Sequence, residues 1–155
     1  MHINRQFSVL AVAAGLLLNS GIGNATDVYA RKTTAVVSLS DVGGTPVTVL
    51  SVSVPSGTWK ATAKSSVVNW GIADYTRCFI TSSTTTASTQ IDSATSFIGG
   101  TLHVATIANE GIISTTATTT FSLTCQHDGF AGAGLYVDPD AKLIVERVSS
   151  GLSNL

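Results

Sequence analysis

The residues best suited to covalent chemistry are two cysteines, Cys78 and Cys125. Each lies in a short segment whose residues alternate as in a β-strand, 77–80 and 122–125. An even number of cysteines favours pairing in an oxidising compartment. A bridge would close a loop of about 50 residues and stabilise the fold by about 4 kcal/mol on the chain-entropy model. We therefore expect a structural disulfide, with two buried free thiols or a metal pair as the alternatives.

Histidines and aspartates are too scattered to predict a metal site. His103 follows a Gly-Gly pair on the outward face of a strand, and His127-Asp128 stands at a strand end. Two histidines and an aspartate can bind zinc, but no spacing brings them together. Asp138-Pro139-Asp140 with Asp128 offers oxygen atoms, yet the glycine and alternating acids of a calcium loop are missing. We expect surface or turn positions for these residues and no bound metal.

Catalytic motifs are also missing from the sequence. Serine is abundant, but no Gly-x-Ser-x-Gly elbow occurs, and no phosphate-binding glycine loop or dinucleotide fingerprint appears. A hydrolase with paired carboxylates would depend wholly on folding to bring its acids together, because they are single in the sequence: Asp74, Asp92, Glu110 and Glu146. The sequence therefore predicts a protein that is not an enzyme, with no catalytic residue and no cofactor.

Aromatic side chains are the remaining candidates for ligand contact. Trp59 and Trp70 fall on opposite faces of one expected strand, because their positions differ by an odd number, 11. If Trp70 is exposed near Tyr75, the two rings could stack on a sugar; packing in the core or at its rim is the alternative. A structure with both rings buried would remove the carbohydrate hypothesis.

The N-terminal segment has the order of a secretory signal peptide. A short, weakly basic stretch, 1–6, precedes an apolar run, 7–18, and Gly23-Asn24-Ala25 places small residues at a cleavage site. We expect cleavage before Thr26, with a site after Ala30 as second choice and a first strand or helix of the fold as the alternative interpretation. The apolar run of about 12 residues is shorter than the roughly 20 that cross a bilayer, so no stable membrane insertion is expected after cleavage. A secreted, periplasmic or extracellular location follows.

The expected mature chain, 26–155, has the size of one domain. It carries seven Lys or Arg and nine Asp or Glu, since Arg5 is the single charged residue of the segment before it. The sequence contains no basic patch, so it does not predict binding to nucleic acid or to an anionic membrane. Charged residues make up 11% of the whole chain, so serine and threonine must supply much of the surface. Threonine is β-branched and suits a strand.

Alternating residues recur along the mature chain, whereas helical periodicity is almost absent. In 58–70, Trp59 and Ala61 begin an inward face, and Lys60 begins an outward one. We expect turns at 55–57, at Gly99-Gly100 and at 109–111, and a solvated loop or ragged edge strand at 82–90. The pattern predicts an all-β fold of about eight strands in a two-sheet antiparallel sandwich. The strand segments are 33–40, 46–54, 58–70, 75–81, 96–98, 101–107, 112–126, 135–137 and 141–148.

Two segments carry a resemblance to a known superfamily. In 52–63 an apolar strand reaches Pro55-Ser56-Gly57 and continues into a strand led by Trp59, and 141–148 is an apolar closing strand. This order resembles the jelly rolls of the tumour necrosis factor and complement globular-head superfamily, in which an aromatic residue, usually tyrosine, stands where Trp59 does. The resemblance implies a jelly roll, often a homotrimer, that contacts proteins or surfaces without catalysis. The chain departs from the pattern in having no collagen-like stalk and few aromatic residues.

The sequence therefore predicts an exported, non-catalytic β-sandwich that acts as an interaction or structural module at the cell envelope or outside the cell. Its partner would be a protein or a surface ligand of unknown identity. A carbohydrate-binding module using Trp70 and Tyr75 is the alternative. A hydrolase or a protease inhibitor is a third hypothesis, and 82–90 is the one segment long enough for an inhibitory loop.

Overall fold

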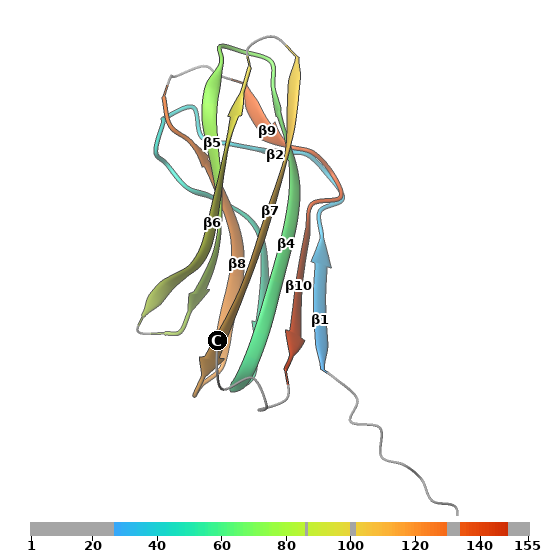
Figure 1. Ribbon diagram of the computed structural model, residues 1–155, viewed down its shortest axis with the longest axis vertical. Coiled ribbons are helices and arrows are strands. Elements are labelled where there is room, and N and C mark those ends of the chain that lie inside the picture. The colour runs from blue at the N-terminus through green and yellow to red at the C-terminus, as the bar shows by residue number, and fades with distance from the viewer. Residues whose placement is uncertain (1–26, 86, 100–101, 130–133, 149–155) are drawn as a thin grey trace, which may run out of the picture.

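The computed structural model describes residues 27–85, 87–99, 102–129 and 134–148, which form an all-β sandwich (Figure 1). The expected signal peptide lies outside these residues. No helix in the described part of the chain is long and apolar enough to cross a membrane. The strands are β1 (Val28–Lys32), β2 (Val37–Ser38), β3 (Val47–Val54), β4 (Gly57–Asn69), β5 (Asp74–Ser83), β6 (Ser88–Ile98), β7 (His103–Thr115), β8 (Thr119–His127), β9 (Leu135–Val137) and β10 (Lys142–Arg147).

The strands form two antiparallel sheets that pack face to face. The first has the order β1-β10-β4-β9-β2, with β7 paired along the other edge of β4, and the second has the order β3-β8-β5-β6. Figure 1 shows the sandwich edge-on, with β4 and β7 on one side and β5 and β8 on the other. The predicted two-sheet antiparallel sandwich is confirmed. The described residues form ten strands instead of about eight, and β1 matches none of the expected segments.

The predicted faces of the long strand β4 are confirmed. Trp59, Ala61 and Val67 are fully buried between the sheets, whereas Lys60 and Lys64 lie on the outward face. This alternation follows from the period-two geometry of a strand that is buried on one side. Phe121, Leu123 and Cys125 of β8 are likewise buried from the opposite sheet. The core therefore lies between β4 and β8.

Trp59 anchors the end of the core where β3 turns into β4. Its indole nitrogen donates to the carbonyl of Pro55 at 3.0 Å, so burying the ring leaves no polar atom unpaired. Tyr29 meets the ring edge-on with centroids 5.6 Å apart, and the Arg147 guanidinium lies 4.5 Å from the ring centroid. The aromatic residue expected in the core is thus contacted from the edge strand β1 and from its neighbour β10.

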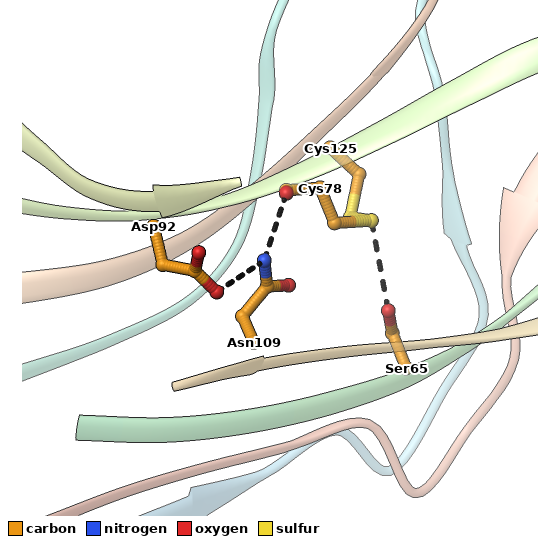
Figure 2. The surroundings of a disulfide bond; sticks show 5 residues. All are labelled: Ser65, Cys78, Asp92, Asn109 and Cys125. Carbon is orange, nitrogen blue, oxygen red and sulfur yellow. Dashed lines mark hydrogen bonds between the residues drawn. A yellow bond between two sulfur atoms is a disulfide. The ribbon is translucent and has the colours of Figure 1, made fainter. Parts of the chain in front are cut away.

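The disulfide between Cys78 and Cys125 is present and joins β5 to its neighbour β8 (Figure 2). The two cysteines are directly opposite in the antiparallel register, with Cα atoms 4.1 Å apart. Both are fully buried and face the other sheet, where the Ser65 hydroxyl lies 3.6 Å from the Cys78 sulfur. The bridge therefore ties two strands of one sheet at the centre of the core.

The predicted turn at 109–111 is wrong, because these residues lie inside β7. Asn109 points inward, and its amide donates to the Cys78 carbonyl at 3.1 Å and to the Asp92 carboxylate at 3.1 Å (Figure 2). Gly111 packs under Ile91, where a Cβ atom would lie 2.3 Å from the Ile91 Cγ2. Residues typical of turns are therefore used here for contact between the two sheets, where β7 lies against β6.

Two other boundaries also differ from the prediction. The hydroxyl-rich segment 82–90, expected as a solvated loop or a ragged edge strand, contains the end of β5 at Ser83 and the start of the edge strand β6 at Ser88, so both strands are longer than expected. The expected long strand 112–126 is divided between β7 and β8 by a turn at 116–118. Ser and Thr suit either a loop or a wet strand face, so composition could not locate these turns.

Candidate functional site: the apolar end of the sandwich

One end of the sandwich carries most of its exposed large apolar side chains. At this end, uppermost in Figure 1, β4 turns into β5, β6 into β7, and β2 leads to β3. Exposed large apolar residues lie at the tips of these three connections and on the strands beside them. We call this set the apolar end, and its members are Val42, Ile72 and Leu102 at the tips and Trp70, Tyr75 and Phe97 on the flanks.

The opposite end provides a contrast within the same molecule. Its connections contain serine, threonine and alanine at Ser56, at 84–87 and at 116–118. In the described residues, no exposed large apolar side chain lies in those turns, although Val28 is exposed at the start of β1 nearby. The difference between the ends therefore follows from sequence and is not a general property of the sandwich.

Trp70 stands just beyond β4, with its ring fixed on the outer face of the first sheet. Its indole nitrogen donates to the Tyr136 hydroxyl at 2.8 Å. Tyr136 pairs in register with Val68, and Val104 pairs with Val68 from the other side. Trp70 remains 58% exposed, so both its polar atom and its orientation are set while its ring remains open to contact.

Tyr75 lies near the start of β5, on the outer face of the second sheet. It is opposite Phe97 of β6 in the register, and the two ring centroids are 5.1 Å apart. Both rings are more than half exposed. The carbohydrate hypothesis required that Trp70 and Tyr75 not both be buried, and this condition is met.

The structure does not join Trp70 and Tyr75 into one platform. Trp70 contacts an outward residue of the first sheet and Tyr75 an outward residue of the second, so the two rings flank the end from opposite sides. Each has an aromatic partner that the sequence reasoning missed. Finding Tyr136 and Phe97 requires knowing which strands pair as well as which residues face outward. A single sequence does not show the strand pairing.

Beneath the apolar end lies a buried ionisable pair, Asp74 and His127. The His127 Nδ1 lies 2.9 Å from the Asp74 Oδ2, and its Nε2 lies 2.6 Å from the Ser40 carbonyl. Both bonds form only when both ring nitrogens carry protons, because both partners are acceptors. His127 was expected at the surface or in a turn; that expectation is wrong, since its side chain is 1% exposed. The pair joins β5, β8 and the segment before β3.

The carboxylate of Asp74 is also bonded to the backbone. The amide of Tyr75 donates to one oxygen at 2.7 Å and the amide of Gly129 to the other at 3.0 Å. Burial by itself raises the pKa of the Asp74 carboxyl, but the hydrogen bond from His127 and these two amides outweigh burial and lower the pKa below its usual value. Asp74 is therefore held in its charged form in a buried place.

A second ion pair lies at the surface, where Arg77 shares the outer face of β5 with Tyr75. Arg77 donates from Nε to the Asp128 Oδ1 at 2.7 Å and from a terminal nitrogen to the other oxygen. The bidentate hydrogen bond from Arg77 lowers the pKa of the Asp128 carboxyl. Asp128 is therefore not available to the acidic turn near Asp140, whose own carboxylate lies 2.7 Å from the Lys32 ammonium.

The candidate metal ligands of the sequence are not brought together. His127 is committed to Asp74 and Ser40, and His103 lies exposed at the start of β7, where its ring covers Gly99. In the ranges that the structure describes, no group of three or more His, Cys, Asp or Glu side chains is placed to hold an ion. The predicted 138–140 turn is confirmed, with Asp140 at a φ of 73°.

Comparison with known proteins finds likeness in structure and not in sequence. No family model matches the chain, and no curated protein matches it. The fold resembles a structure of infectious bursal disease virus Gx strain, with a TM-score of 0.56 and 16% identity over 80% of this chain and 32% of that one. The likeness is one of fold.

Two further solved structures also resemble the fold of this chain. The infectious bursal disease virus VP2 subviral particle gives a TM-score of 0.50 and 13% identity over 84% of this chain and 35% of that chain. The structure of the Gt strain of the virus gives a TM-score of 0.54 and 11% identity over 94% of this chain and 38% of that chain. The chain spans about a third of the length of each. Viral jelly-roll sandwiches are thus its structural neighbours, in agreement with the expected fold class.

Proposed function

We propose that the mature chain is an exported, non-catalytic β-sandwich module that contacts a partner through its apolar end, at the cell envelope or outside the cell. The observation that carries the proposal is the gathering of exposed aromatic and aliphatic side chains at one end, against hydroxyl-rich turns at the other. Large exposed apolar patches on a protein mark interaction sites. The likeness to viral sandwich proteins supports a structural module, because this chain shares their fold.

The hydrogen bonding of the buried acid–base pair, Asp74 and His127, supports the non-catalytic part of the proposal. Asp74 and His127 are buried, and every polar atom of the two side chains is bonded to the other or to backbone. A general acid or base must reach a substrate. A groove of about 500 Å³ runs between the edge strands β1 and β3, and its one ionisable side chain other than Tyr29 is Arg31. Neither place combines a nucleophile with a base.

Photocrosslinking in the exporting cells tests the contact surface. A benzophenone amino acid replaces Phe97 at the apolar end or, as the matched control, Ile112 on the outer face of β7. We expect a covalent product, with protein or lipid, from position 97 and none from position 112. Equal products at both positions, or none at position 97, would contradict the proposal.

A carbohydrate-binding role remains the second candidate, because Trp70 is exposed and oriented by Tyr136. Aromatic rings with a fixed plane suit stacking on a sugar. Electrophoresis in gels containing soluble polysaccharides tests it: a retardation removed by Trp70→Ala and kept by Phe97→Ala would favour a sugar site on the first sheet. Unchanged mobility in every polysaccharide would exclude this role for those sugars.

A homotrimer is a separate part of the proposal. The resemblance of 52–63 to the tumour necrosis factor and complement globular-head superfamily supports it, since trimers are common there. Light scattering during size-exclusion chromatography of the mature chain measures the state directly. A trimer is the expected result, and a monomer would overturn this part while leaving the proposed contact surface intact.

A further inference from the structure

The apolar end differs from an ordinary binding face in being apolar on its tip and on both flanks. Trp70 flanks it on the outer side of the first sheet, and Tyr75 with Phe97 on the outer side of the second. A flat partner surface would cover one flank and leave the other in water. A surrounding medium would cover both.

The three tips extend this apolar surface between the flanks. Val42 is 65% exposed, Ile72 66% and Leu102 57%, and each comes from a different connection. Leu102 has a φ of 62°, a conformation that leucine rarely adopts and that costs free energy.

The described arginine at this end, Arg77, is paired with an acid. Arg77 pairs with Asp128 on the outer face of the second sheet, and Asp74 is hydrogen-bonded to His127 inside. The described lysines lie on other parts of the strands or at the acidic turn; they are Lys32, Lys60, Lys64 and Lys142. Asp41 adds a negative charge beside Val42. Among the residues that the structure describes, no lysine or arginine at this end is unpaired. Such an end matches an uncharged or zwitterionic surface, and it is not suited to an anionic one.

We infer that the apolar end docks into a lipid surface with zwitterionic headgroups, the tips entering the acyl boundary and Trp70, Tyr75 and Tyr136 lying at the level of the headgroups. Aromatic residues with a polar atom favour that level of a bilayer. The contact is peripheral and crosses no bilayer. This inference rests on the proposed function, because it names the partner of the same surface.

The mature protein with its disulfide intact is tested by sedimentation with phosphatidylcholine vesicles. We expect it to partition onto these vesicles and not to bind more tightly when phosphatidylglycerol is added. The double substitution Ile72→Ser with Leu102→Ser should weaken partition at least ten-fold, because it removes two apolar side chains from the lipid contact. Val28→Ser, an exposed valine near the other end, is the matched control and should leave partition unchanged.

Tryptophan fluorescence gives an independent measurement. Trp70 is exposed and Trp59 is buried, so vesicles should shift the emission of the native protein to shorter wavelength and leave Trp70→Phe unshifted. The far-ultraviolet circular dichroism of each variant shows that its sandwich is folded. No partition, partition that requires anionic lipid, or equal partition of the double variant would overturn the lipid inference.

The two proposals can fail separately. A protein crosslinked at position 97, together with no binding to either kind of vesicle, would overturn the lipid partner and uphold the contact surface. Absence of both crosslinks and vesicle binding would overturn both.

Discussion

At the scale of single residues, we expect the buried Asp74–His127 pair to contribute to stability. It connects the start of β5, the end of β8 and the Ser40 carbonyl, so it holds the framework under the apolar end. Removing one partner of a buried pair leaves the other without compensation, which costs about 3 kcal/mol. We expect Asp74→Asn to lower the free energy of unfolding in urea by that amount. Asp41→Asn, an exposed aspartate in the same region, is the control, and equal losses would contradict this role for the pair.

The same carboxylate predicts how stability depends on pH. The pKa of Asp74 is lowered in the folded protein, so the unfolded chain binds a proton at higher pH than the folded one. Its contribution is complete above the unfolded value of 3.8 and is lost as pH falls through the lower folded value. Urea midpoints measured from neutral to acid pH should therefore fall less steeply in Asp74→Asn than in the native protein. Parallel curves would show that Asp74 does not carry the acid sensitivity.

At the scale of elements, the disulfide fixes the pairing of β5 with β8. The cysteines are 47 residues apart in the chain, and the bridge removes that loop's freedom from the unfolded state. Replacing both Cys78 and Cys125 by alanine should lower the free energy of unfolding by about 4 kcal/mol. Urea unfolding of the double variant, beside native protein under reducing and oxidising conditions, measures this. A loss below about 1 kcal/mol would contradict a main role in stability.

The contact between β6 and β7 depends on the missing side chain of Gly111. An added Cβ would lie 2.3 Å from the Cγ2 of Ile91, a branched side chain that cannot easily move aside. Gly111→Ala should destabilise the sandwich by about 1–3 kcal/mol, as overpacking does. Combining it with Ile91→Ala removes the clash, so the double variant should lose less than the sum of the single losses. Additive losses in thermal unfolding would show that the two residues do not meet.

At the scale of the whole molecule, the proposed export predicts where the mature chain begins. Cleavage after Ala25 would leave Thr26 and Asp27 before β1, which starts at Val28 and pairs with Glu146 of β10. Cleavage after Ala30 would remove Val28, Tyr29 and Ala30, three of the five residues of that strand. Intact-mass measurement of the exported protein should therefore give a chain starting at Thr26, with the two cysteines oxidised. A chain that retains Met1, or one found inside the cell, would contradict the signal peptide.

The sequence by itself determined the all-β class, the inward faces of β4 and β8 and the disulfide. Each follows from local rules, because alternation places Trp59 and Phe121 in the core wherever their strands pair. An even cysteine count likewise predicts a bridge, and with only Cys78 and Cys125 the partners are fixed.

Tertiary structure alone decided which residues meet across the chain. Asn109 and Gly111 have turn propensities that contact with β5 and β6 overrides, and Asp74 and His127 are 53 positions apart in sequence yet share a buried bond. The apolar end was equally hidden. Its side chains are separate in the sequence, and only the antiparallel pairing of strands brings their connections to one end of the molecule. Long-range pairing is not encoded in local periodicity, so the candidate site became visible only with the fold.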